Sequence, residues 1–372
     1  MVHRYPDHYF ICIETEMTLF RTFLDTAPAE LLTHPRIYYF TDKDMDRVQN
    51  LISYLHLIRI KQDIKFRIFK YIPLTGLFRE KYDSIETSLL QEFTTFYSNI
   101  LTERNFRELW QRNIRKNSAS LLHVRKLLEL KNSLSGKPLI IASAGPSLEK
   151  NMDFIRTSRD RMVLVSVDTA LRYLMKHGIE PDYVLSLDAK YENLNDFKFL
   201  DFPDPVRLVF DIISFPRITK FFREKFVTYT YKLIRDFQAD GFQKYYDDDI
   251  RPLIEQYGDF GGLQSGGSVS TNALDLALFL DADPVYLVGL DLNYVNYKTH
   301  CRGTYKELYY LSRMNKFYNY ETLNFTFVVQ RENIREVKGN DVYHHDFILR
   351  KYKKWFEDAL ELIKDKKKIV VV

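Results

Sequence analysis

Three stretches of the sequence combine residue types that could bind a phosphorylated ligand. In the first, KPLIIASAGPSLEKN, an apolar run stops at Ser143 and Ala144, and a Gly145-Pro146-Ser147 turn leads into a helix-like pattern. Gly145 permits a close backbone approach, Pro146 fixes the entry dihedral, and Ser147 is a good N-cap. Free amides at such a helix start attract anions. The turn matches neither G-x-x-x-x-G-K-[ST] nor G-x-G-x-x-G, so an ordinary capped turn is the alternative.

The second stretch is DFGGLQSGGSVSTNALDLALFL, which holds four of the thirteen glycines within seven residues. Gly267 and Ser268 precede an Ala/Leu-rich helix pattern, with Ser270 and Thr271 in its first turn. Two helix starts of this kind on one sheet suggest a nucleotide bound at more than one point. The alternative is tight helix packing that requires small residues.

Acidic residues at the ends of apolar runs form a third signal. Asp168 ends MVLVSVD, Asp188 ends YVLSLD, and Asp291 ends VYLVGLD. Carboxylates at the carboxyl ends of parallel strands fit ribose or base recognition, positioning of a water molecule, or a metal ion. Helix N-capping is the alternative for each of them.

One of the nine histidines follows the Asp291 run and lies near two phenols. In NYVNYKTHCRG, His300 comes after Tyr294 and Tyr297, which is where a general base would be expected. His344 and His345 in GNDVYHHDF are a second candidate pair, and a solvated surface histidine is the alternative. The sequence contains no nucleophile elbow in a Ser-His-Asp order and no H-E-x-x-H.

The elements that must position these residues form a mostly parallel α/β fold. Apolar runs alternate with helix-like patterns over 137–300, which predicts a Rossmann-like sheet covered on both faces. We expect a small α/β domain over 1–83, a helical connector over 84–136, and a helical C-terminal segment over 301–372.

Composition limits the kinds of protein that this chain can be. At 372 residues the chain is longer than a domain with a single hydrophobic core usually is, so we expect more than one domain. The 54 basic and 50 acidic residues give a net charge of +4, which does not indicate nucleic acid binding. The two cysteines form no disulfide framework or thiolate metal cage, and neither a signal segment nor a membrane span is evident. We therefore expect a cytoplasmic protein.

Taken together, the motifs resemble a family. IIASAGPSLEKN, VSVDTALRYLMKHGIEPDYVLSLDAKYENLNDF and GGSVSTNALDLALFLDADPVYLVGLDLNY with KTHCRG look like the motility-associated factor (Maf) flagellin glycosyltransferases. That family shares its central region with archaeal 6-hydroxymethylpterin diphosphokinases. The lead-in FRELWQRNIRKNSASLLHVRKLLELKNSLSGKPL and the segment VKGNDVYHHDFILRKYKKWFEDAL extend the match over nearly the whole chain. This C-terminal segment, together with the N-terminal domain, favours Maf over the pterin kinases. Maf chains usually continue past a run such as KKKIVVV, so the resemblance predicts a shortened C-terminal segment.

The resemblance implies a fold of sialyltransferase type and a role for each motif. The donor would be a nonulosonic acid activated by cytidine monophosphate (CMP), and the acceptor a Ser or Thr hydroxyl of flagellin. His300 would be the base of an inverting displacement that needs no metal cofactor. Contacts to the donor would come from Ser143, Ala144, Gly145, Pro146, Ser147, Asp168, Asp188, Gly267, Ser268 and Asp291, with Tyr294 and Tyr297 facing the phosphate. Ser143-Ala144 departs from the glycine or asparagine usual before the turn.

Two other classes of function remain open at this point. In a pterin pyrophosphokinase, Asp168, Asp188 and Asp291 would hold Mg²⁺ on ATP. A non-catalytic flagellin-binding protein could keep the same fold, because fold alone does not establish chemistry.

Overall fold

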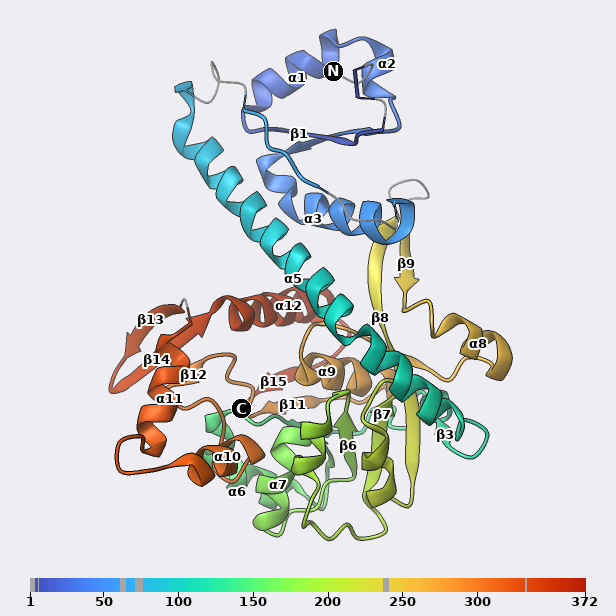
Figure 1. Ribbon diagram of the computed structural model, residues 1–372, viewed down its shortest axis with the longest axis vertical. Helices are drawn as coiled ribbons and strands as arrows, with labels where there is room; N and C mark the ends of the chain where they lie inside the picture. The colour runs from blue at the N-terminus through green and yellow to red at the C-terminus, as the bar shows by residue number, and fades with distance from the viewer. Residues whose placement is uncertain (1–3, 6, 61–64, 71–75, 237–240, 332) are drawn as a thin grey trace. The chain divides into compact units, whose positions relative to one another are not determined.

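The computed structural model describes residues 4–5, 7–60, 65–70, 76–236, 241–331 and 333–372. These residues form two compact units (Figure 1). One unit comprises Met1–Arg107 with Leu233–Tyr245, and the other comprises Glu108–Lys232 with Tyr246–Val372. The division falls inside one continuous helix, whereas the expected boundaries lay at 83 and 136. A continuous helix offers no break in composition to mark such a point.

The first unit is a small α/β arrangement. Its first two strands pair in parallel, and Phe40, Val48, Leu51 and Phe96 are buried in its core. Its elements are β1 (Phe10–Glu14), α1 (Met17–Thr26), α2 (Ala29–Leu32), β2 (Ile37–Thr41), η2 (Asp42–Asp44), α3 (Met45–Tyr54), η3 (Leu55–Ile60), the first part of α5 (Arg79–Ser118) and β9 (Gly241–Tyr245).

The second unit is built on a parallel sheet, which confirms the expected fold class. In the described residues the strand order is β10-β8-β7-β6-β5-β4-β11-β15, and β3 also pairs with β8. Neighbouring strands along this order all pair in parallel. The strands are β3 (Arg125–Lys126), β4 (Leu139–Ala142), β5 (Val163–Val167), β6 (Tyr183–Ser186), β7 (Arg207–Asp211), β8 (Lys225–Asp236), β10 (Gly262–Gln264), β11 (Val285–Val288) and β15 (Ile369–Val371).

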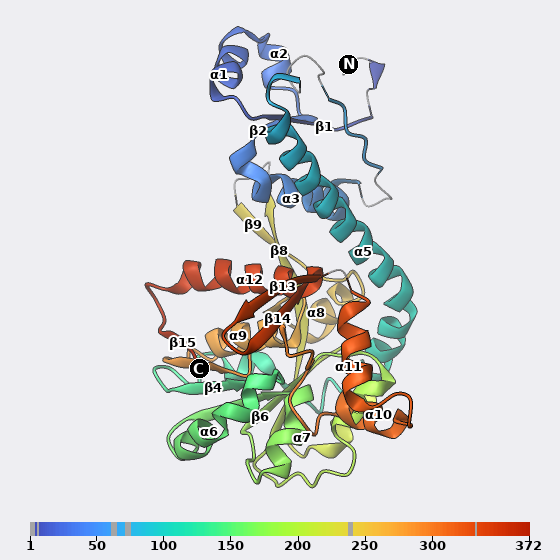
Figure 2. The ribbon, with the colours of Figure 1, turned by 90° about the vertical axis from the view of Figure 1, so that its left-hand side faces the viewer.

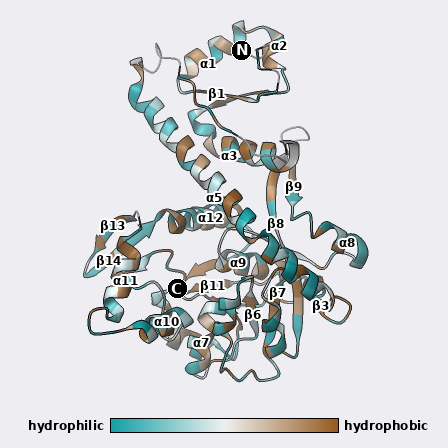
Figure 3. Ribbon diagram, in the orientation of Figure 1, coloured by the Kyte–Doolittle hydropathy of each residue, from teal (hydrophilic) through white to brown (hydrophobic). Residues whose placement is uncertain are grey.

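The central strands are apolar because both faces of the sheet are covered. All residues of β4 and β6 are buried. Helices α9 (Val269–Phe279) and α12 (Phe347–Ile363) lie on one side, and α6 (Met152–Ser158) and α7 (Asp168–Lys176) on the other (Figures 1 and 2). Right-handed crossovers place helices on both faces of the sheet when the chain changes direction along it. Here the chain moves outward from β4 to β8 and then returns to β11. In Figure 3, β11 is hydrophobic while α5 and α10 (Tyr305–Arg313) are largely hydrophilic.

The C-terminal segment contributes strands as well as helices. Besides α10, α11 (Tyr320–Val329) and α12, it contains β13 (Asn333–Lys338), β14 (Asp341–Asp346) and β15. β13 and β14 form an antiparallel hairpin around Gly339 and Asn340, and β12 (Tyr294–Val295) pairs with β14. The short glycine-containing turn between two strand-like runs explains why this region is not purely helical. Four short elements complete the unit: η4 (Leu127–Leu130), η5 (Pro146–Asn151), η6 (Tyr191–Asp196) and η7 (Pro216–Phe221), together with α8 (Arg251–Tyr257).

No helix in the part of the chain that the structure describes combines the length and apolar character needed to cross a membrane.

Two buried asparagines near the end of α5 hold the loops that follow β6 and β7. The Asn113 amide donates to the carbonyls of Ala189 and Ile213, both at 2.9 Å. The Asn117 amide donates to the carbonyls of Ile212 and Ser214, at 2.8 and 2.9 Å. Helix α5 therefore fixes the loops at the carboxyl ends of these strands.

Replacing Asn117 by alanine should destabilise the second unit by about 1–3 kcal/mol, because two buried carbonyl groups lose their donor. Denaturant unfolding followed by tryptophan fluorescence measures this, since Trp110 and Trp355 both lie in that unit. The exposed Lys116→Ala on the same helix is the control and should change the free energy of unfolding by less than about 0.5 kcal/mol. Equal midpoints for the two variants would contradict the assigned role.

Candidate active site

The candidate site lies where the strand order reverses, between β4 and β11. These neighbouring parallel strands end at the same edge, and their backbones stay hydrogen-bonded beyond the last paired residues. The Ser143 amide donates to the Val288 carbonyl at 2.8 Å, and the Gly145 amide donates to the Gly289 carbonyl at 2.9 Å. In open parallel sheets, ligands bind outside the carboxyl ends of the strands at this reversal.

The helix that follows the Gly-Pro-Ser turn begins earlier than expected. Gly145 is the N-cap and Pro146 the first residue of a six-residue 3-10 helix, which α6 then follows. The expectation that Ser147 is the N-cap is therefore wrong. Pro146 already has a helical φ and no amide hydrogen, so it suits the first helical position and moves the cap back to Gly145.

A carboxylate of the protein already accepts a hydrogen bond from a backbone amide of this turn. Asp291 Oδ2 accepts a hydrogen bond from the Ser147 amide at 2.9 Å. Burial raises the pKa of Asp291, and the hydrogen bonds from Ser147 act in the opposite direction. A Cβ atom on Gly145 would lie 2.1 Å from Asp291 Oδ2 and 2.5 Å from the Gly289 carbonyl oxygen. Gly145 is therefore required for the contact between the two strand ends.

The glycine-rich stretch reaches the same place. Ser270, in the first turn of α9, shares a 2.8 Å hydrogen bond with Ser143. Thus the structure joins two motifs that lie 127 residues apart in the sequence.

Close packing accounts for the residues just before α9. Ser268 is the N-cap, and it forms a reciprocal capping box with Thr271. A Cβ atom on Gly267, which has φ +96°, would lie 2.7 Å from the Tyr352 ring. Gly266 is equally restricted by Trp355. Helix α12 thus packs directly on the glycine-rich turn.

The loop with His300 lies against the Gly-Pro-Ser turn. The Cys301 amide donates to the Ala144 carbonyl at 2.9 Å, and the Arg302 amide donates to Glu149 Oε1 at 2.8 Å. His300 is half-buried, and its Nδ1 lies 3.2 Å from the Thr299 hydroxyl. Burial, with a smaller effect of the Lys306 charge, lowers the pKa of His300 to about 3. The imidazole is therefore neutral at physiological pH, and the lowered pKa makes it a weak base.

The two tyrosines have different surroundings. Tyr294 is buried, and its hydroxyl donates to Asp346 Oδ2 at 2.7 Å. Burial and this bond raise the pKa of Tyr294 above its ordinary value. Tyr297 has φ +64°, and its ring lies 4.6 Å from that of His344 and 4.9 Å from that of Phe325. Tyr294 thus has a protein partner, whereas Tyr297 lines a surface hollow.

Asp168 lies in a hydrogen-bonded network at the end of β5. Its Oδ2 accepts from Asn193 Nδ2 at 2.7 Å and from the Ser186 hydroxyl at 3.0 Å, while Oδ1 accepts from the Thr169 amide at 2.8 Å. Burial raises the pKa of Asp168, and these bonds partly offset the effect. Asp188 is exposed and accepts from the Lys190 amide at 2.9 Å.

Sequence reasoning missed two acidic residues at this edge. Asp196 at the end of η6 is buried, and its pKa is raised by burial and then by the charge of Asp168, while Arg172 acts in the opposite direction. Asp211 at the end of β7 is buried, and burial raises its pKa to about 6. Asp211 ends an apolar run in the same way as Asp168, so the signal was present in the sequence. No three His, Cys, Asp or Glu residues in the described ranges are grouped so that they could hold a metal ion.

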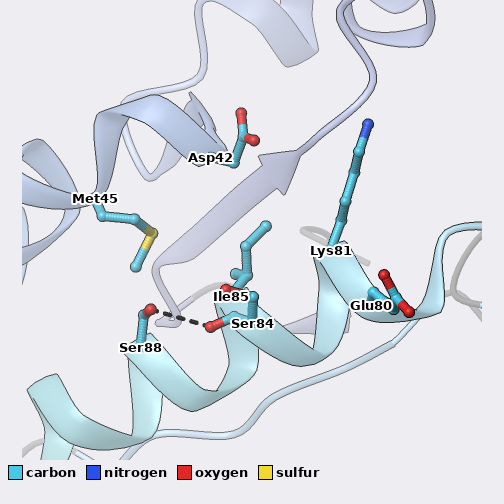
Figure 4. Close-up of a pocket in the computed structure, with 7 residues that line it drawn as sticks. All are labelled: Asp42, Met45, Glu80, Lys81, Ser84, Ile85 and Ser88. Atoms are coloured by element: carbon cyan, nitrogen blue, oxygen red, sulfur yellow. Dashed lines mark hydrogen bonds between the residues drawn. The ribbon is translucent and has the colours of Figure 1, made fainter.

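Two hollows open on the surface. One has a volume of about 740 Å³ and is formed by the loop with Tyr297 and by α10 and α11; Arg302, Glu307, Tyr320 and Phe325 line it. The other, of about 360 Å³, belongs to the first unit and lies between Asp42, Met45 and the start of α5 (Figure 4). The first hollow shares the 294–303 loop with His300, so it adjoins the candidate site.

The fold is similar to that of a solved glycosyltransferase. The structure of a Maf glycosyltransferase from Magnetospirillum magneticum AMB-1 aligns with 100% of this chain and 54% of its own, with a TM-score of 0.56 and 14% sequence identity. Identity at this level establishes the fold alone. Residues 112–297 match the family described as 6-hydroxymethylpterin diphosphokinase MptE-like, and because the match covers half of the chain, the chain belongs to this family. The family match confirms the expected relation to the 6-hydroxymethylpterin diphosphokinases, and the structural similarity confirms the expected fold class.

Three uncharacterized proteins of Treponema pallidum (strain Nichols) are also similar. One is 28% identical over 316 residues, covering 80% of this chain and 50% of the relative. The others are 26% identical over 180 residues, with coverages of 43% and 83%, and 24% identical over 153 residues, with coverages of 41% and 50%. The chain spans about half the length of the first relative and of the Maf glycosyltransferase.

Substitution of Gly145 by alanine should destabilise the second unit by about 1–3 kcal/mol, because the new methyl group overlaps Asp291 and the Gly289 carbonyl. The midpoint of unfolding by tryptophan fluorescence reports this loss. Gly76→Ala is a suitable control, since a Cβ atom there meets nothing within 4 Å. If Gly145→Ala unfolds like the wild type, the contact between the strand ends is not required.

The pKa of Asp211 predicts a pH-dependent stability. The folded state binds this proton more tightly than the unfolded state, in which the pKa is about 4. The contribution to stability is thus full below pH 4 and is lost as the pH rises through about 6. An asparagine at this position cannot ionise, so we expect Asp211→Asn to keep its stability as the pH rises from 4 to 7, while the wild type loses stability over this range. Parallel pH profiles of the two proteins would show that the carboxyl group is ionised in the folded state.

Proposed function

We propose that this protein is a glycosyltransferase that moves a nonulosonic acid from a CMP-activated donor to a Ser or Thr hydroxyl. Flagellin is the proposed acceptor and the cytoplasm the proposed location, as in the Maf family that the motifs resemble. The reaction would be a direct displacement that inverts the anomeric centre.

One observation carries this proposal. The Gly-Pro-Ser turn, the start of α9 and the His300 loop come from three separate parts of the chain and meet at the reversal of strand order, through Ser143–Ser270 and Cys301–Ala144 contacts. This edge is where parallel α/β folds bind nucleotides. A base held beside a nucleotide site is what a displacement by a hydroxyl group requires.

The position of Asp291 affects where the donor phosphate would bind. A phosphate on the Ser147 amide would have to displace or closely approach the Asp291 carboxylate, which repels it. We therefore place the phosphate toward the hydroxyl groups of Ser143 and Ser270 and the amides at the start of α9. Asp291 would hold the turn in shape.

His300 is the proposed general base. Its pKa of about 3 means that no proton has to be removed from it before catalysis at physiological pH. A weak base of this kind accepts the acceptor proton late, as the hydroxyl oxygen bonds to the anomeric carbon and the CMP leaves. Helix amides and hydroxyl groups could balance the charge that develops on the phosphate.

A second candidate function is a pyrophosphokinase acting on a pterin. The family match over residues 112–297, to 6-hydroxymethylpterin diphosphokinase MptE-like proteins, favours it. In that reaction Mg²⁺ on ATP neutralises charge on the transferred group, and Asp168, Asp188 and Asp291 would be its ligands. Asp168 and Asp291 already accept hydrogen bonds from neighbouring groups, so we prefer the glycosyltransferase.

A thermal-shift panel of CMP, CDP, ATP and a 6-hydroxymethylpterin distinguishes the two functions. The ligand that binds the folded state raises the unfolding temperature by mass action. We expect CMP and CDP to do so in the presence of excess EDTA, and transfer from a CMP-nonulosonic acid to flagellin also to survive EDTA. Stabilisation by ATP and the pterin that requires Mg²⁺ would favour the pyrophosphokinase.

In the same transfer assay, His300→Ala should lower the rate roughly 10²-fold or more while CMP affinity stays nearly unchanged. Because the imidazole is neutral, the wild-type rate should show no decline attributable to His300 between pH 5 and 8. His345→Ala, in the hairpin, is the control and should have a much smaller effect. Loss of CMP binding in His300→Ala would assign the histidine a structural role.

A further inference from the structure

Two cations lie on one aromatic ring beside the candidate site. The Lys306 ammonium is 3.7 Å from the centre of the Phe327 ring, and the Arg331 guanidinium carbon is also 3.7 Å from that centre. Lys306 comes from the first turn of α10, and Phe327 from α11. The two charges have the same sign and share one ring, so a negative charge nearby would stabilise the pair.

Asp346 supplies negative charge on the Arg331 side of the ring. Arg331 Nε lies 3.5 Å from Asp346 Oδ2, which also accepts from the Tyr294 hydroxyl, while Oδ1 caps α12 through the Leu349 amide. Among the described residues, Lys306 Nζ makes no hydrogen bond, and no carboxylate oxygen lies within 4 Å of it. Within the part of the chain that the structure describes, Lys306 therefore has no carboxylate of its own at ion-pair distance.

The surroundings of Lys306 disfavour its own charge. The side chain is half-buried, and burial, followed by the charge of Arg331, lowers the pKa of Lys306 to about 8, with Asp346 acting in the opposite direction. A positive charge in the first turn of a helix is also disfavoured by the helix dipole. A bound anion would relieve each of these costs.

The location relates this pair to the reaction. Lys306 is close enough to His300 for its charge to lower the pKa of the imidazole. His300 precedes Cys301, which is hydrogen-bonded to the Gly-Pro-Ser turn. An anion held at Lys306 would therefore lie beside the proposed base.

We propose that Lys306 and Arg331 form a recognition site for an anionic group of the donor, which is the carboxylate of the sugar or the phosphate of the nucleotide. The inference rests on the proposed function in naming the donor, but the anion site itself does not. The sugar carboxylate is a natural choice, because it would orient the anomeric carbon toward His300. If the two cations only pack on Phe327, they have no such selectivity.

Calorimetric titration of variants with two ligands identifies the source of the anion. Lys306→Met should weaken binding of CMP-N-acetylneuraminate roughly tenfold or more, since a charged hydrogen bond is lost. Binding of CMP alone stays unchanged if the group is the sugar carboxylate, and weakens equally if it is the phosphate. Arg331→Met should behave in the same way, and Lys306→Arg should restore much of the affinity.

Lys316→Met is the matched control. Lys316 also lies over a phenylalanine ring, 4.9 Å from the centre of Phe317, but on the exposed segment after α10. This variant should bind both ligands like the wild type. Unchanged affinities in Lys306→Met and Arg331→Met would overturn the proposal.

A second measurement separates this inference from the proposed function. Acylation of Lys306 in the wild-type protein, followed by peptide mass spectrometry, should be slowed by N-acetylneuraminate or by pyrophosphate, but not by neutral N-acetylmannosamine. If no CMP derivative binds while one of the two anions protects Lys306, the proposed function fails and the anion site stands. If neither anion protects Lys306, the site is refuted whatever the donor is.

Discussion

The pairing of β4 with β11 is the contact on which the candidate site depends. After β4 the chain passes through β5 to β10 of the same sheet and then returns beside β4 as β11. The turn after β4 therefore lies against the residues after β11, through the Gly145 amide and the Gly289 carbonyl. Only glycine fits at 145, because any Cβ atom would overlap the Asp291 carboxylate. From this contact follow the position of Asp291 and of the loop that carries His300.

Burial shifts the pKa values of the acidic and the basic groups around this edge in opposite directions. Asp168, Asp196, Asp211 and Asp291 all have raised pKa values, and burial is the main cause for each. On the side of the 294–331 segment, His300 and Lys306 have lowered pKa values for the same reason. The common effect is a low-dielectric edge at which ionised groups are destabilised. In such surroundings a fixed dipole or a bound counter-charge has a larger effect than it has in water.

Several residues combine a packing role with their place near the site. Gly267 admits the ring of Tyr352, and Ser268 caps α9, so both have a structural reason to be what they are. Tyr294 likewise holds Asp346, which caps α12. The proposed chemistry therefore relies on residues that neither cap a helix nor fill such a packing position, namely Ser143, Ser270, Tyr297, His300 and Lys306.

The sequence by itself determined the parallel sheet, since uninterrupted apolar runs such as 139–142 and 163–167 suit strands buried on both faces. It also identified the Gly-Pro-Ser turn, the glycine-rich stretch and the histidine loop, because glycine, proline and strand-end polar residues leave local patterns. Only the tertiary structure decided which of these meet. The Ser143–Ser270 and Cys301–Ala144 contacts, the carboxylate on the Ser147 amide and the cations on Phe327 join residues distant in sequence. Local patterns do not encode such contacts, because strand order and crossover direction bring them about.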